Sequence, residues 1–163
     1  MSSRQQNPAV RIIDVLGARG QTVATAESLT AGRVCVELTA PPGASRVVCG
    51  GVVAYLPRVK TELLGVPAEM IATAGVVSAE VAGAMADGAR AVCGAQWGLG
   101  TTGAAGPKHH DGQPPGTVWT CVATPSGRLY PQRYVLDGDR DDVCRATTDL
   151  ILRQLLSLLD SDA

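Results

Sequence analysis

The residues with the clearest chemical potential lie in one polar segment, residues 25–30, which contains Glu27, Ser28 and two threonines. A short β-branched run at 22–26 leads into it, and the apolar positions of 33–38 recur at helical spacing after it. This pattern predicts a strand, a turn and a helix. Such a turn raises a serine above the carboxyl edge of a sheet, beside helix N–H groups that can hold a developing negative charge. Two interpretations are open: Ser28 is a nucleophile, or a hydroxyl of this segment only caps the helix.

Lysine is rare in this chain, and Lys60 lies where a catalytic base would be useful. Lysine and arginine total 14 residues, but only Lys60 and Lys108 are lysines. Lys60 follows an apolar strand and precedes Leu63 and Leu64 by one helical turn, so burial can lower its pKa and leave the amine neutral. Tyr55, at the end of that strand, is placed to relay a proton or to hold the lysine by a hydrogen bond. The alternative is a surface lysine beside a core tyrosine.

The two histidines, His109 and His110, are adjacent and lie in a Gly- and Pro-rich segment, residues 103–115. Adjacent side chains point in different directions, and no third residue has the spacing of a metal ligand. We therefore predict a loop without a metal site. A Ser-His-Asp triad would have to draw its base from this loop, which favours lysine as the base for Ser28.

Two further motifs are imperfect matches to ligand-binding sequences. Residues 98–103 fit the dinucleotide pattern G-x-G-x-x-G, but prolines follow where a helix should open, and no acidic residue occupies the expected place after a next strand. Residues 137–141 resemble the start of a calcium loop, but Asp142 stands at its glycine position and Thr148 at its bidentate glutamate position. Neither motif predicts a bound cofactor or metal.

The composition is that of an ordinary soluble protein. The 163 residues, 45% hydrophobic and 18% charged, fit one domain. A net charge of −1 without a basic stripe argues against nucleic-acid binding. Five widely spaced cysteines without a C-x-x-C pair indicate reduced thiols of a cytoplasmic protein. No apolar run is long enough to span a bilayer, so we expect no membrane association.

Hydrophobic periodicity and turn residues predict alternating helices and strands. Helices are predicted at residues 8–16, between Ser28 and the prolines at 41–42, after Pro57, at 67–73, from Ser78 to Gly94 and at 140–159. Strands are predicted at 22–26, 47–55, 97–101, 117–124 and 129–136, the last two as an antiparallel hairpin. This order predicts a single three-layer α/β/α domain with a mixed sheet over residues 8–160, after a disordered tail over residues 1–7.

Several motifs, in order, resemble the CinA C-terminal domain, the nicotinamide-nucleotide amidohydrolase family. They are T-A-E-S-x-T-x-G at 25–32, P-G-A-S at 42–45, G-V-V-x-Y-x-x-x-x-K-x-x-L-L-G-V at 51–66, G-V-V-S-x-E-V-A at 75–82, T-G-x-A-G-P at 102–107, P-G-T-V-W at 115–119 and G-D-R at 138–140. The resemblance covers residues 8–159, nearly the whole chain.

The resemblance implies the fold of that domain and the hydrolysis of nicotinamide mononucleotide (NMN) to nicotinate mononucleotide and ammonia, without a metal or other cofactor. Ser28 would be the nucleophile, and Lys60 and Tyr55 the proton-transfer partners. The residues implied around the substrate are Glu27, Thr30, Gly32, Thr102, Gly103, Ala105 and Gly106. Arg140 and Arg145 are candidates for the phosphate, because a guanidinium binds a phosphate through two hydrogen bonds.

The sequence departs from the family pattern beside the tyrosine, where Leu56 and Pro57 occupy positions at which Ser and Asn are common. Leu29 and Ala31 also replace a common cysteine and glycine. The lost polar groups leave two other functions open: a nucleotide-binding or competence-associated protein without catalysis, and an amidase for another small amide. The resemblance also implies a homo-oligomer, a dimer or larger. Family members often carry an added N-terminal domain, whose pyrophosphatase activity is not expected here.

Overall fold

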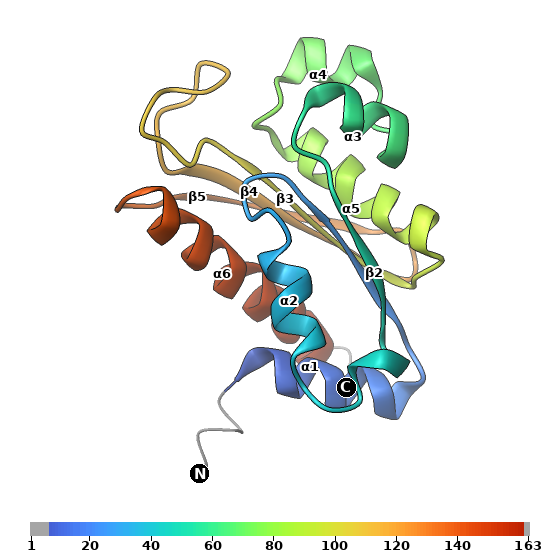
Figure 1. The fold of residues 1–163 in the computed structure, drawn as a ribbon. Coiled ribbons are helices and arrows are strands. Elements are labelled where there is room, and N and C mark those ends of the chain that lie inside the picture. The colour runs from blue at the N-terminus through green and yellow to red at the C-terminus, as the bar shows by residue number, and fades with distance from the viewer. Residues whose placement is uncertain (1–6, 162–163) are drawn as a thin grey trace.

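The computed structural model describes residues 7–161, which build five strands and six α-helices around one sheet (Figure 1). The strands are β1 (Val23–Glu27), β2 (Val48–Val53), β3 (Trp97–Gly103), β4 (Thr117–Ala123) and β5 (Leu129–Val135). The helices are α1 (Pro8–Arg19), α2 (Arg33–Thr39), α3 (Pro57–Leu64), α4 (Ala68–Ala74), α5 (Ala79–Cys93) and α6 (Arg140–Ser161), with a 3-10 turn, η2 (Ala44–Arg46).

The sheet has the strand order β2-β1-β3-β4-β5. β2 and β3 flank β1 in parallel, whereas β4 and β5 continue the sheet in antiparallel fashion. At its last residue, Glu27, β1 pairs with Val53 of β2 and Thr101 of β3. Because the carboxyl ends of parallel strands meet at one edge of a sheet, Ser28 and Ala54 leave their strands side by side there.

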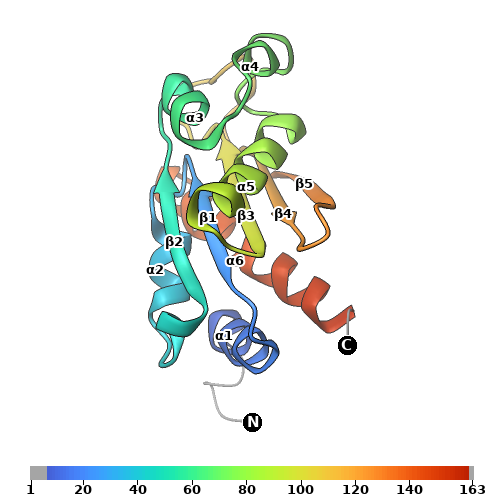
Figure 2. The same cartoon turned by 90° about the vertical axis from the view of Figure 1, so that its right-hand side faces the viewer.

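Helices cover both faces of this sheet. α1, α2 and α6 lie on one face and α3, α4 and α5 on the other (Figure 1), and α5 crosses in front of the strands when the molecule is turned (Figure 2). Ile12, Leu99 and Leu155 are among the buried side chains that close the first interface. Leu64 and Met85 help to close the second. The predicted three-layer α/β/α fold with a mixed sheet is confirmed.

Two strands, β2 and β3, end two residues away from their predicted ends, and the other three end within one residue of theirs. β2 ends at Val53 rather than at residue 55, so the backbone of Ala54 and Tyr55 leaves the strand. β3 continues to Gly103 rather than ending at residue 101, because it pairs with β4 as far as Val118. The last hydrogen bonds of a strand come from a distant part of the chain, which a local pattern does not report.

The start of α1 is defined by a residue that the sequence places in the tail. Asn7 Oδ1 accepts a hydrogen bond from the N–H of Ala9 at 2.9 Å, and Pro8 occupies the first turn. The other residues of the predicted tail, 1–6, lie outside the described residues. No helix within residues 7–161 is long and apolar enough to cross a membrane.

The G-x-G-x-x-G motif lies in β3, where its first two glycines let α5 pack closely against the sheet. A Cβ atom at Gly98 would lie 2.0 Å from the carbonyl oxygen of Ala86, and one at Gly100 would lie 2.3 Å from that of Ala82. No helix opens at the end of the motif, so the N-terminus that binds a dinucleotide phosphate is missing. The glycines of this motif therefore allow α5 to pack closely against β3.

Replacing Gly100 by alanine should lower the free energy of unfolding by about 2 kcal/mol or more, because the added methyl group overpacks the contact between β3 and α5. Gly17→Ala is the matched control, since its added Cβ lies 3.6 Å from Val47 Cγ2 within α1, where alanine is favoured. Urea unfolding followed by circular dichroism measures both changes. Equal midpoints for Gly100→Ala and wild type would contradict the packing explanation.

Candidate active site

Ser28 directly follows β1 at the carboxyl edge of the three parallel strands. Its N–H donates to the carbonyl of Thr101 at 3.1 Å, so the backbone is still tied to β3 where the chain begins to turn. Only 9% of the residue is exposed. Because consecutive side chains of an extended chain point to opposite faces, Ser28 faces away from Glu27 and toward α3.

Lys60 reaches Ser28 from α3. Lys60 Nζ lies 2.9 Å from Ser28 Oγ, and Lys60 has no exposed surface. Two backbone carbonyl oxygens contact the same nitrogen, that of Ala54 at 2.6 Å and that of Tyr55 at 3.3 Å. Burial lowers the pKa of Lys60 from 10.5 to about 8. The structure therefore brings together the two residues that the sequence pairs, and the two carbonyls are partners that the sequence did not indicate.

The turn between β2 and α3 explains how Lys60 is positioned. The N–H of Ala54 donates to the carbonyl of Glu27 at 2.8 Å, which ties the turn to the end of β1. Leu56 has the extended conformation of an N-cap, and Pro57 takes the first helical position, for which its ring fixes the backbone angle. Lys60 follows within the first turn of the helix, so its side chain is directed back toward the two carbonyls.

Glu27, expected beside the substrate, is instead the acidic cap of α2. Its carboxylate accepts hydrogen bonds from the backbone N–H groups of Gly32, Val34 and Cys35 at 2.9 to 3.1 Å, and the residue is 1% exposed. The negative charge thus satisfies the first N–H groups of the helix and its positive end. The expectation that these N–H groups face Ser28 is wrong, because Glu27 occupies them from the other face of the sheet.

Thr30 and Gly32 belong to the same cap and do not line the cavity at Ser28. The Thr30 hydroxyl lies 2.6 Å from a carboxylate oxygen of Glu27 and 2.8 Å from Thr101 Oγ1. Gly32 has a φ of +97°, which lets the chain turn into α2. These residues shape the turn that carries Ser28.

Tyr55 contributes its backbone, not its phenol, to Lys60. The phenol oxygen is hydrogen-bonded to the guanidinium of Arg140, and the residue is 55% exposed. No hydrogen bond joins the phenol to Lys60 or Ser28 within residues 7–161. The predicted side-chain bond to lysine is therefore absent, because the ring points toward the start of α6 while the carbonyl faces the amine.

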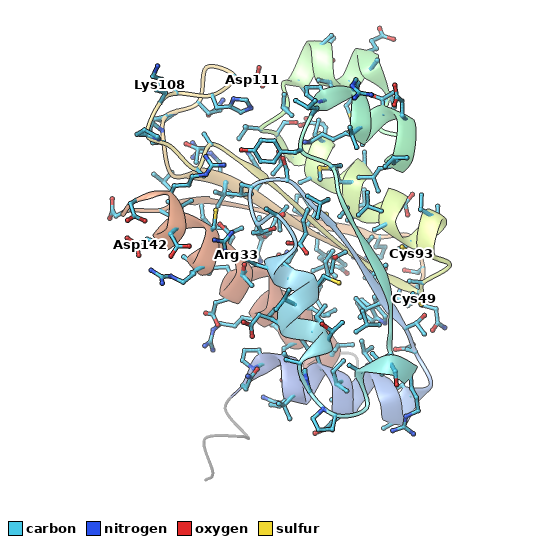
Figure 3. All side chains as sticks on the ribbon, in the orientation of Figure 1. Arg33, Cys49, Cys93, Lys108, Asp111 and Asp142 are labelled. Carbon is cyan, nitrogen blue, oxygen red and sulfur yellow. The ribbon has the colours of Figure 1, made fainter. Side chains whose placement is uncertain are left out.

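A cavity of about 400 Å³ opens over Ser28. It is lined by residues 55–57, at the turn between β2 and α3, by residues 103–110 of the loop and by Arg140. The loop brings Lys108 and both histidines to the cavity, and Lys108 lies near the tip of the loop (Figure 3). The sequence predicted a solvated loop here and missed its contact with the site, since no local pattern reports what a loop covers.

Three further residues implied by the resemblance, Gly103, Ala105 and Gly106, line this cavity. Thr102 does not line it. The hydroxyl of Thr102 donates to the carbonyl of Val76 at 2.7 Å, and Val76 is itself a wall residue that the sequence did not single out. Thr102 therefore acts on the cavity by holding one of its walls.

Of the two arginines that are candidates for binding the substrate phosphate, only one lines the cavity. Arg140 lines the cavity, and its guanidinium donates to the carbonyl of Gly106 at 3.2 Å. Arg145 lies outside it and pairs with Asp141 at 3.1 Å and with Asp142, labelled in Figure 3, at 2.8 Å. Residues five positions apart in an α-helix differ in direction by about 140° around the helix axis. Arg140 and Arg145 therefore face different surfaces.

The acidic segment that resembles a calcium loop is the cap of α6. Asp139 Oδ1 accepts hydrogen bonds from the N–H groups of Asp141 at 2.8 Å and Asp142 at 2.9 Å. Within the part of the chain that the structure describes, no group of three or more His, Cys, Asp or Glu side chains is arranged to hold a metal ion. The five cysteines are free thiols.

Comparison with known proteins places the chain in a family. Residues 5–159 match the family described as "CinA C-terminal domain". A "CinA-like protein" of Anaeromyxobacter sp. (strain K) is 50% identical over 135 residues, which are 82% of this chain and 33% of that protein. A "CinA-like protein" of Gemmatimonas aurantiaca is 45% identical over 151 residues, 90% of this chain and 34% of that protein. The chain thus spans about a third of the length of these curated relatives.

Solved structures have the same fold. A competence-damaged protein (CinA) superfamily protein from Klebsiella pneumoniae 700603 superposes with a TM-score of 0.91 at 29% identity, over 99% of each chain. The competence/damage inducible protein CihA from Agrobacterium tumefaciens superposes with a TM-score of 0.89 at 32% identity, over 97% of each chain. With a family match over nearly its whole length and the fold in common, this chain belongs to the CinA C-terminal domain family.

Proposed function

We propose that this protein hydrolyses the carboxamide of NMN to nicotinate mononucleotide and ammonia, with Ser28 as the nucleophile and Lys60 as the base. The observation that carries the proposal is the 2.9 Å contact between Lys60 Nζ and Ser28 Oγ, in a buried setting that lowers the pKa of the amine. The choice of NMN rests on the family to which the chain belongs, which includes amidohydrolases.

A neutral Lys60 has as many hydrogen-bonding sites as it has polar neighbours, which are the Ser28 hydroxyl and the carbonyls of Ala54 and Tyr55. A neutral amine has two N–H donors and one lone pair. The carbonyls of Ala54 and Tyr55 accept the two N–H bonds, which leaves the lone pair for the hydroxyl proton of Ser28. Once protonated, Lys60 donates to all three oxygens. The same contacts therefore hold the lysine before and after it takes up the proton.

The reaction proceeds through an ester of Ser28. Lys60 takes the hydroxyl proton as Ser28 Oγ bonds to the carboxamide carbon, and the carbonyl oxygen becomes an oxyanion. When the intermediate collapses, the C–N bond breaks, and Lys60 gives its proton to the nitrogen, which leaves as ammonia. Water, activated by Lys60, then hydrolyses the ester and frees the carboxylate product. The pyridinium charge of NMN disfavours a protonated amine nearby, so it helps to keep Lys60 neutral.

The oxyanion needs donors other than the helix N–H groups that Glu27 occupies. The backbone N–H groups of Leu29 and Ala105 belong to residues that line the cavity, and no hydrogen bond among residues 7–161 engages either of them. We assign stabilisation of the oxyanion to these two groups, because donors already fixed in a buried site lower the barrier without having to reorganise.

The residues that line the cavity suit the two ends of the substrate. Leu56 and Pro57 supply an apolar surface for the pyridine ring. Arg140 is the proposed phosphate partner, since it lines the same cavity and a guanidinium binds phosphate oxygens in pairs. The departure from the family pattern at Leu56 and Pro57 retains the helix start that positions Lys60, so it is compatible with catalysis.

Ser28→Ala should reduce ammonia release from NMN by about 1,000-fold or more, because the variant lacks the nucleophile. Lys60→Met should cause a loss of similar size, because no group then accepts the serine proton. A coupled assay for ammonia measures the rates, and circular dichroism checks that each variant folds. Wild-type activity in Ser28→Ala would overturn the mechanism.

The same assay, together with a measurement of NMN binding, separates the alternative functions. Tight binding of NMN without turnover by the wild type would favour a nucleotide-binding protein. Turnover of another amide in a panel of small amides, without turnover of NMN, would favour a different amidase.

The value of kcat/KM should rise with pH and reach half its maximum near pH 8. Only neutral Lys60 accepts the serine proton, and its pKa is lowered by burial to about 8, so the active form accumulates as the pH rises through that value. Initial rates measured between pH 6 and pH 10 give the profile. A profile that stays level from pH 7 to pH 9 would contradict Lys60 as the base.

Arg140→Met should raise KM for NMN about tenfold or more, because a charge-assisted contact with the phosphate is lost. Arg145→Met is the matched control, since its ion pairs are exposed and outside the cavity, and it should change KM by less than about twofold. Nicotinamide riboside, which lacks the phosphate, tests the cause. If Arg140→Met raises KM for both substrates equally, Arg140 does not bind the phosphate.

A further inference from the structure

The loop that forms one wall of the Ser28 cavity is attached to the segment between α4 and α5 by the side chain of Asp111. Asp111 Oδ2 accepts a hydrogen bond from the N–H of Val76 at 2.5 Å. The carbonyl of Val76 accepts a hydrogen bond from Thr102 at 2.7 Å, so both polar groups of this backbone unit are engaged. Val76 also lines the cavity, and the contact therefore joins two of its walls.

The backbone conformations of Gly75 and Asp111 allow this contact to form. A Cβ atom at Gly75 would lie 2.3 Å from Asp111 Oδ2, and Gly75 has a φ of +83°. Asp111 itself has a φ of +52°, which is uncommon for residues with a side chain but tolerated by aspartate. On the helix side, Ser78 Oγ donates to the carbonyl of Gly75 at 2.8 Å and caps α5. Asp111 therefore binds to a segment whose backbone is held by the cap of α5.

Different contacts hold the base and the tip of the loop. At the base, Ala104 makes two backbone hydrogen bonds, at 2.7 and 2.8 Å, with the segment that leads into β4. At the tip, His110 and Gln113 exchange backbone hydrogen bonds at 3.0 and 2.9 Å, which shape the turn without tying it to another element. Asp111 lies inside this turn (Figure 3), so its bond to Val76 connects the tip to the rest of the protein.

We propose that Asp111 is a positioning residue that latches the tip of the loop to Val76, in the segment between α4 and α5, and so holds Lys108 and both histidines as a fixed wall of the Ser28 cavity. Without the latch, the wall adopts many arrangements, and binding of a substrate then includes the entropic cost of ordering it. The effect on substrate rests on the function proposed above. It falls on KM rather than on kcat, because Ser28 and Lys60 belong to other elements.

The distribution of lysines allows a direct test of the loop. Lys108 is exposed within it, whereas Lys60, the other lysine, is fully buried. An endoprotease that cuts only after lysine therefore reports on the loop of the native protein. Asp111→Ala should be cut after Lys108 about tenfold faster than wild type or more, because the hydrogen bond that connects the tip of the loop to Val76 is lost.

Two variants serve as controls for this cleavage. Asp111→Asn should be cut at nearly the wild-type rate, because its amide oxygen accepts the same N–H. Asp137→Ala removes an exposed aspartate from the segment between β5 and α6 and should leave the cleavage rate unchanged. Unfolding midpoints of all variants, measured in urea, show whether faster cleavage comes from the loop or from loss of the whole fold.

Kinetics with NMN test the effect on the substrate. Asp111→Ala should raise KM about tenfold and change kcat by less than about threefold, and Asp111→Asn should restore KM. Equal cleavage rates for wild type and Asp111→Ala would overturn the latch. Faster cleavage with an unchanged KM would overturn its role in the substrate site. If the wild type releases no ammonia from NMN, the proposed function fails, and the cleavage rates alone decide the latch.

Discussion

The amine of Lys60 is buried against backbone carbonyl groups, and the arrangement around Ser28 depends on this contact. No carboxylate pairs with this lysine among the described residues, so burial disfavours its charge and lowers its pKa to about 8. For the contact to form, β2 must end at Val53, which turns the next two carbonyls toward the amine, and α3 must begin at Pro57. A longer strand would point those two consecutive carbonyls in opposite directions, so they could not both contact the amine.

The side chain of Glu27 is also buried, and it faces the side of the sheet opposite to Lys60. Adjacent residues at the end of a strand point to opposite faces, so one short segment sends a carboxylate to α2 and a hydroxyl to Lys60. The carboxylate satisfies the N–H groups at the start of α2, and the hydroxyl is left as the reactive group. The two side chains are therefore separated by the sheet itself, which keeps the negative charge of Glu27 from pairing with the lysine and raising its pKa.

Long-range packing explains why the G-x-G-x-x-G motif at residues 98–103 has a structural role instead of binding a dinucleotide. The glycines at 98 and 100 admit the backbone of α5, which brings the segment that leads into that helix to the loop of residues 103–115. The same contact gives Val76 and Asp111 their places beside the cavity. A pattern typical of dinucleotide binding is used here to set the distance between a helix and a sheet, and through it the shape of a cavity wall.

The sequence by itself determined the order of helices and strands and the turn at Ser28, and it singled out Lys60 as a candidate base, whereas the tertiary structure decided that Lys60 reaches Ser28. The features determined by the sequence follow from local signals: hydrophobic periodicity, prolines and glycines at element ends, and a lysine retained in an arginine-rich chain. Only the tertiary structure decided that Glu27 caps a helix, that Tyr55 offers a carbonyl and that Arg145 lies outside the cavity. Each of these depends on the direction of one side chain and on neighbours far away in the sequence, which periodicity and spacing do not specify.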